Sequence, residues 1–141
     1  MRLLVPDASV ILKWVLPPEH EPNAREAALI LDQFVAGENV LAVPTLWYYE
    51  VANTIARLAP GEAGERLRQL RRLGMAEVGP TDAIERRALD CVKRFGVTYY
   101  DAAYHATAVE LHGVLVTADR RFAARLGDDP AIVDLRQISV E

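Results

Sequence analysis

Residues 114–119, Val114-Leu115-Val116-Thr117-Ala118-Asp119, form the clearest β pattern of the chain and indicate its fold. The first four residues predict a buried strand, and the aspartate that follows can begin a helix. The N-terminal segment repeats this arrangement, because a strand predicted at residues 3–6 is followed directly by Asp7. Two strands that each lead through an aspartate into a helix are typical of a parallel sheet with helices between its strands.

Short apolar segments alternate with helical segments along the rest of the chain. Further strands are predicted at residues 40–43, 76–78 and 132–138. Helices are predicted at residues 8–16, 23–35, 44–58, 82–95, 99–112 and 120–126, with an arginine-rich helix that ends near residue 73. This alternation predicts an α/β fold class, with a parallel sheet covered on both faces, and one domain over residues 1–141. In such sheets ligands bind beyond the carboxyl ends of the strands.

The composition is that of an ordinary globular protein, with 51% hydrophobic and 26% charged residues. The net charge of −4 argues against a simple nucleic-acid coat protein, although arginines are clustered along the chain. The one cysteine, Cys91, excludes an internal disulfide and a zinc site built on thiolates. No stretch approaches the roughly 18 uninterrupted apolar residues of a membrane span, so we expect a cytoplasmic protein without a membrane partner.

Four acidic residues are candidates for a functional site, and each also has a structural interpretation. Asp7 and Asp119 follow predicted strands and could simply cap the next helix. Asp101 ends the motif Thr98-Tyr99-Tyr100-Asp101, which matches a helix capping box. Glu50 could be a solvated residue on the polar face of its helix, but Asn53 lies one turn away on the same face.

The combination of these acids is more informative than any one of them. Asp7 and Asp119 should both end strands, Asp101 should start a helix, and Glu50 should approach from a flanking helix. Carboxylates a few ångströms apart repel one another, so such a cluster needs protons or a cation. Oxygen ligands favour Mg²⁺ or Mn²⁺, and these ions assist phosphodiester hydrolysis by neutralising the phosphate and activating water.

Four blocks of the sequence resemble those of PIN domains, most closely the VapC toxins of prokaryotic toxin–antitoxin pairs. The blocks are Val5-Pro6-Asp7-Ala8-Ser9, Pro44 to Glu50-Val51-Ala52-Asn53, Tyr100-Asp101-Ala102-Ala103-Tyr104 and Thr117-Ala118-Asp119-Arg120-Arg121-Phe122. The resemblance covers nearly the whole chain, with the acids in the order of the family. It implies a three-layer α/β/α sandwich and a metal-dependent endoribonuclease.

The resemblance also implies which residues and partners take part. Asp7, Glu50, Asp101 and Asp119 take the catalytic, metal-binding roles, with Mg²⁺ or Mn²⁺ as cofactor. Ser9, Asn53 and Thr117 match positions near the site. The implied partners are an RNA substrate, a cognate VapB-like antitoxin that occupies the active cleft, and a second copy of the chain in a homodimer.

Two other functions compete with this interpretation. A PIN-like binding module without catalysis would need the same fold, but the intact acids argue against it. A Mg²⁺-dependent phosphoacceptor signalling domain normally has paired acids after its first strand and a lysine after a late strand. Asp7 has no acidic neighbour, and the only lysines are Lys13 and Lys93. His105 and Cys91 are expected in the core, since neither lies at the spacing of a metal-binding motif.

Overall fold

The computed structural model describes residues 1–139, which contain a five-stranded parallel sheet. The strands are β1 (Arg2–Pro6), β2 (Asn39–Pro44), β3 (Ala76–Val78), β4 (Val114–Thr117) and β5 (Ile132–Asp134), in the order β3-β2-β1-β4-β5. β1 lies at the centre, and its Pro6 is in register with Val116 of β4. Because β1 and β4 are parallel neighbours, the residues that follow them leave the sheet at the same edge.

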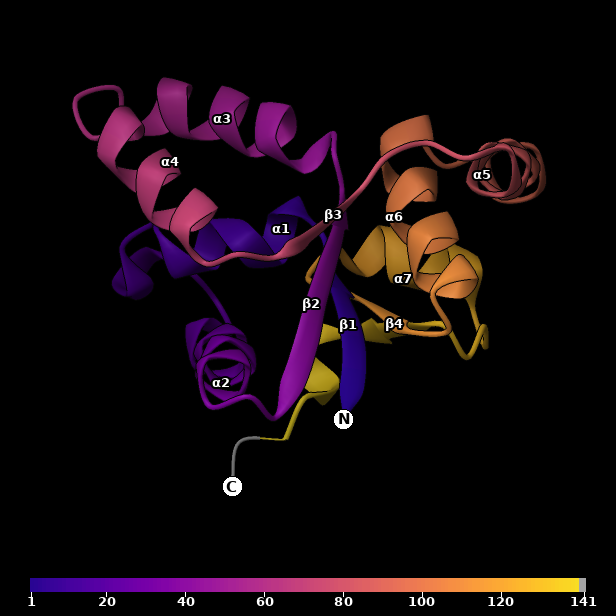
Figure 1. Cartoon of the computed structure of the whole chain (residues 1–141), viewed down its shortest axis with the longest axis horizontal. Coiled ribbons are helices and arrows are strands. Elements are labelled where there is room, and N and C mark those ends of the chain that lie inside the picture. Colours follow the sequence, from indigo (N-terminus) through magenta and orange to yellow (C-terminus); the bar gives the residue numbers. More distant parts are fainter. Residues whose placement is uncertain (140–141) are drawn as a thin grey trace.

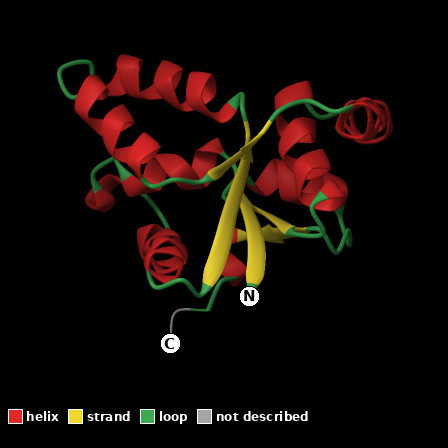
Figure 2. Cartoon of the chain, viewed as in Figure 1, coloured by secondary structure: helices red, strands yellow, loops and turns green. Residues whose placement is uncertain are grey.

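Helices cover both faces of this sheet, as predicted. Figure 1 shows one group of helices on one side of β1 and β2: α1 (Ala8–Ile11), α2 (Ala24–Val35), α3 (Trp47–Leu58) and α4 (Ala63–Arg72). The opposite side carries α5 (Asp82–Phe95), α6 (Tyr99–Glu110) and α7 (Arg120–Leu126). Figure 2 shows the strands as a layer between the two groups. The predicted three-layer α/β/α sandwich is therefore confirmed.

Helix α6 is buried almost along its whole length. Its alanines at 102, 106 and 108 are fully shielded from solvent, and it packs between the sheet and α5. Small side chains allow this close approach, because the helix surface then stays near its own backbone. The first turn of α6, which carries Asp101, is thereby placed beside the edge where β1 and β4 end.

Three predicted boundaries were wrong. The helix predicted at residues 8–16 is regular only to Ile11 and continues as the 3₁₀ helix η1 (Leu12–Trp14). Pro44 does not open a helix, because it is the last residue of β2 and pairs with Val78. At the end of a strand its missing N–H costs no central ladder bond.

The strand predicted at residues 132–138 is also shorter than expected. It stops at Asp134, whose carboxylate accepts the backbone N–H of Arg136 at 2.9 Å. Gln137 completes a capping box with Asp134, so the chain turns into the 3₁₀ helix η3 (Leu135–Gln137). A further 3₁₀ helix, η2 (Pro18–His20), precedes α2. Within residues 1–139, no helix combines the length and the apolar character that a membrane crossing requires.

Candidate active site

Asp7 directly follows β1 and is almost fully buried, with 4% of its surface exposed. Its Oδ1 accepts hydrogen bonds from the Ser9 hydroxyl and, at 3.4 Å, from the Val10 N–H, so Asp7 caps α1. The Ser9 Oγ accepts in turn from the Ala118 N–H at 2.9 Å. Ser9 therefore connects the first acid to the loop that follows β4.

Asp119 lies in that loop and is exposed to solvent. Its Oδ1 accepts the backbone N–H groups of Arg121 at 3.0 Å and Phe122 at 3.1 Å, which caps α7. Its own N–H donates to the buried Thr117 hydroxyl at 3.0 Å, so Thr117 fixes the backbone that carries Asp119. Among the described residues, Oδ2 of Asp119 makes no hydrogen bond.

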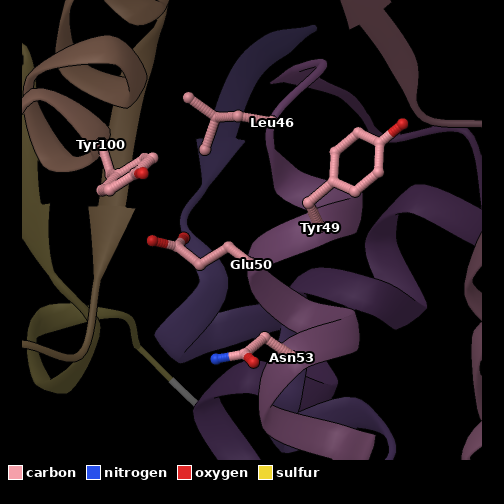
Figure 3. A pocket seen from close by; sticks show the side chains of 5 residues that line it. All are labelled: Leu46, Tyr49, Glu50, Asn53 and Tyr100. Carbon is pink, nitrogen blue, oxygen red and sulfur yellow. The ribbon is translucent and has the colours of Figure 1, made fainter.

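Glu50 reaches the site from α3 and is half-buried. Its Oε1 accepts a hydrogen bond from the hydroxyl of Tyr104 at 2.9 Å, which joins α3 to the fully buried ring on α6. Burial raises the pKa of Glu50, and the hydrogen bond from Tyr104 opposes that effect. Figure 3 shows the Glu50 carboxylate directed away from α3, toward the side where Tyr100 lies.

Asp101 occupies the first turn of α6. The Thr98 hydroxyl caps this helix by accepting the Asp101 N–H at 3.1 Å, so the predicted N-terminal cap is present. The reciprocal half of a capping box, from the Asp101 carboxylate to the Thr98 N–H, is not formed. The predicted box is thus only half correct, and the carboxylate is free for another role.

The pKa shifts of these acids include repulsion between their negative charges. The pKa of Asp101 is raised to about 6, mainly by burial, with the charges of Asp119 and Glu50 adding to the shift and the hydrogen bond with Thr98 opposing it. The pKa of Asp7 is raised to about 7, mainly by burial, while Ser9 and Thr117 oppose the shift and the charge of Asp101 adds to it. Asp101 therefore interacts with each of the other three acids. Among residues 1–139, no lysine or arginine side chain forms an ion pair with any of the four.

The four acids fit a hard divalent cation by their chemistry. All their donors are oxygens, they repel one another, and within the described chain no cationic side chain compensates them. Their arrangement is open, because no three acidic, histidine or cysteine side chains of residues 1–139 are grouped closely enough to hold a metal by themselves. Mg²⁺ needs no such closed group, since it commonly keeps several waters and takes only one or two carboxylates.

Two pockets adjoin the acids. The larger, about 480 Å³, is lined by Leu46, Tyr49, Glu50, Asn53 and Tyr100 (Figure 3). The smaller, about 200 Å³, is lined by Asp101 and Asp119 together with the residues Gly96, Val97, Thr98, Arg121, Phe122 and Arg125. Because Glu50 lines one pocket and Asp101 the other, and their charges interact, both pockets adjoin the same acidic centre.

The two residues that the sequence placed in the core, His105 and Cys91, are buried. His105 is buried on α6, where its Nε2 lies 3.2 Å from Asp129 Oδ2, and Cys91 is buried on α5, so both belong to the packing as expected. Tyr104 was not predicted to have a role. Its position three residues after Asp101, on the same side of a helix, was the available signal.

Comparison of the sequence with known proteins gives one family. A PIN-domain model matches residues 4–126, a range that includes all four acids. Ribonuclease VapC3 of Pyrobaculum aerophilum is 33% identical over 140 residues, which cover 94% of this chain and 98% of that protein.

Solved structures share the architecture. The crystal structure of PAE2754 from Pyrobaculum aerophilum matches with a TM-score of 0.64 and 27% identity, covering 96% of this chain and 85% of that one. A toxin–antitoxin complex from Klebsiella pneumoniae matches with a TM-score of 0.69 over 96% of this chain and 98% of that one. At 17% identity, the second likeness shows the fold alone.

Proposed function

Because the chain belongs to the PIN-domain family, and within it to the VapC ribonucleases, we propose that it hydrolyses RNA phosphodiester bonds at the cluster of Asp7, Glu50, Asp101 and Asp119. The observation that carries this proposal is the electrostatic position of Asp101, which interacts with the other three acids where parallel strands end. Without a bound cation, the repulsion between these carboxylates would destabilise the folded protein.

The four carboxylates would hold Mg²⁺ or Mn²⁺, and the bound ion would neutralise the scissile phosphate and lower the pKa of a water. The surrounding side chains hold the carboxylates in place before any ligand arrives. Ser9 and Thr117 fix the loops of Asp7 and Asp119, and Tyr104 orients Glu50 through its hydroxyl. Preorganised ligands of this type lose little freedom on binding.

The test is cleavage of RNA by single-charge variants. Asp101→Asn and Asp119→Asn should each lower metal-dependent cleavage by more than about 100-fold while circular dichroism stays unchanged. Asparagine caps a helix about as well as aspartate at position 119, and the Asp101 carboxylate takes no part in the cap of α6. Asp82→Asn is the matched control, because Asp82 also lies in the first turn of a helix but lines neither pocket beside the acids. Near-normal cleavage by Asp101→Asn would show that Asp101 is not part of the catalytic site.

A PIN-like module that binds RNA without cutting it is the second candidate, and the same assay decides between the two. The wild-type protein would then retain RNA in a filter-binding assay with Mn²⁺ present but release no shortened product. The full set of acids and their support by Ser9, Thr117 and Tyr104 favour the enzyme.

We also infer that the chain is the toxin of a type II pair and that its antitoxin covers the acidic centre. Arginine is the side chain best suited to such an inhibitor, because its guanidinium binds carboxylates through two parallel hydrogen bonds. Expression of the chain alone should arrest growth, and co-expression with a neighbouring antitoxin gene should restore growth and yield a complex. Light scattering on the purified toxin tests the expected homodimer. Harmless expression of the folded wild-type chain would contradict the toxin role.

A further inference from the structure

The larger pocket has aromatic rings at its margin that the proposed hydrolysis does not use. Tyr49 of α3 is 76% exposed and Tyr100 of α6 is 60% exposed, although both are large rings beside an apolar lining. Figure 3 shows the two rings on opposite sides of the Glu50 side chain, with Leu46 between them at the end of the pocket away from Asn53. Exposed aromatic side chains that gather around a pocket mark a binding surface.

The polar groups of this pocket are also available. Among residues 1–139, neither the amide of Asn53 nor the hydroxyls of Tyr49 and Tyr100 take part in a side-chain hydrogen bond. The ring of Tyr49 packs edge-on against Tyr48, with centroids 5.5 Å apart and planes at 85°, so its orientation is supported. A free amide beside planar rings can recognise a flat ligand that has both donors and acceptors at its edge.

The two pockets differ in charge, and this difference indicates which pocket would hold the phosphates of an RNA. The larger pocket is mostly apolar and its only ionisable acid is Glu50, so a phosphate is disfavoured there. The smaller pocket contains Arg121 and Arg125, and Arg125 already donates to the Gly96 carbonyl at 2.6 Å. Arg121 forms no ion pair among the described residues and is available to bind a phosphate.

We propose that the larger pocket binds one unpaired nucleobase of the RNA substrate, stacked on Tyr100 and Tyr49 and contacted at its edge by Asn53. Its volume of about 480 Å³ lies in the range of small-ligand sites and holds a base with part of its ribose. The neighbouring phosphates then lie toward Asp101 and Arg121. This proposal rests on the proposed function, since it deepens the choice of RNA at the same acidic centre.

The test combines tyrosine variants with RNA that lacks a single base. For a short single-stranded RNA that the wild type cuts, Tyr100→Ala should raise KM by about 5- to 150-fold, which corresponds to the cost of losing one stacked base. Tyr100→Phe should behave like the wild type, because it keeps the ring. Tyr99→Ala is the control, since Tyr99 is 40% exposed in the same helical turn but lines a different pocket between β2, β3 and α6.

Removing one base from the RNA should reproduce this effect. An abasic nucleotide at one position near the cut should raise the KM of the wild type by the same factor, and it should cost Tyr100→Ala nothing more. Such non-additivity identifies the base that stacks on Tyr100. Additive penalties at every position, or identical behaviour of Tyr100→Ala and Tyr99→Ala, would overturn the proposal.

A second measurement separates this inference from the proposed catalysis. Short RNAs that carry the fluorescent base 2-aminopurine are titrated with protein in the absence of metal, so that no cleavage occurs. The wild type and Tyr100→Phe should quench the fluorescence at one position, and Tyr100→Ala should quench it less. If the wild type quenches the 2-aminopurine fluorescence but never cuts RNA, the proposed hydrolysis is wrong and the proposed base pocket is supported. If Tyr100→Ala alters only self-association, measured by light scattering, the pocket is a contact between copies and the proposal is wrong.

Discussion

Replacing Asp7 by asparagine should make the metal-free protein more stable at high pH and less stable at low pH. Asp7 is almost fully buried, and burial raises its pKa from 3.8 to about 7. Its ionised form is therefore destabilised in the folded protein relative to the unfolded chain. Below pH 4 the carboxyl is protonated in the folded state and carries no such cost. As the pH rises from about 4 through 7, the wild type loses stability, because the unfolded chain releases its proton first.

The magnitude follows from the two pKa values. The difference between about 7 and 3.8, at about 1.4 kcal/mol per pH unit, corresponds to about 4 kcal/mol of stability that is lost by pH 8. Asparagine keeps an oxygen that can accept from Ser9 and Val10, but it also buries an amide donor, at a cost of about 1–3 kcal/mol at every pH. We therefore expect Asp7→Asn to be the less stable protein near pH 4.5 and the more stable one at pH 8.

Urea unfolding followed by circular dichroism from pH 4.5 to 8, with chelator present, measures this difference. Asp82→Asn is the control, because Asp82 is exposed at the start of α5. Mn²⁺ at ten times its Kd should then add about 1.4 kcal/mol to the wild type, or roughly 5 °C in Tm, and less to Asp7→Asn. A difference between variant and wild type that does not change with pH would refute the reasoning, since Asp7 would then ionise normally in the folded state.

Two further variants test the supports of the site and of the sheet. Tyr104→Phe removes the hydroxyl that donates to Glu50, so we expect kcat to fall by about 10-fold with a stability loss of about 1 kcal/mol; unchanged kcat in a cleavage assay would show that Glu50 needs no such support. Gly113→Ala places a Cβ 2.6 Å from the Leu3 carbonyl oxygen and 2.4 Å from Leu3 Cδ2, and urea unfolding should show a loss of about 1–3 kcal/mol. Gly61→Ala is the control, because a Cβ at Gly61 has no atom within 4 Å and the substitution should cost much less stability. Gly37→Ala is not suitable, because Gly37 has a positive φ.

The parts of the fold that local sequence determines were predicted correctly. The strand that ends at Thr117 and the strand that ends at Pro6 are apolar runs followed by a helix-capping aspartate, and both features depend only on neighbouring residues. The position of Asp7 and Asp119 at one edge then follows from parallel pairing, which the alternation of strands and helices already required. The predicted cap at Asp101 was half correct for the same reason, since Thr98 acts locally.

The features that sequence could not predict depend on contacts between distant segments. The hydrogen bond from Tyr104 to Glu50 spans 54 residues. The position of Tyr104 one turn after Asp101 sets it apart from the exposed Tyr99 and Tyr100, but it does not indicate that Glu50 is the partner. The pocket beside Glu50 is formed by α3 and α6 together, so it has no local pattern. The early end of β5 was missed because a capping box at Asp134 ends the strand after Val133 and Asp134, although further apolar residues follow at 135 and 138.

Helix capping and metal binding are compatible functions of the same aspartates, although the sequence presents them as alternatives. Asp119 uses Oδ1 to accept two backbone N–H groups, and its Oδ2 makes no hydrogen bond within residues 1–139. Both hydrogen bonds that Asp7 accepts from Ser9 and Val10 likewise fall on Oδ1. A cap fixes the side chain through one oxygen and leaves the other for a ligand, so it supplies the rigidity that an acidic site needs. The strand–aspartate–helix pattern can therefore predict the position of such a site, while the tertiary contacts decide which acids complete it.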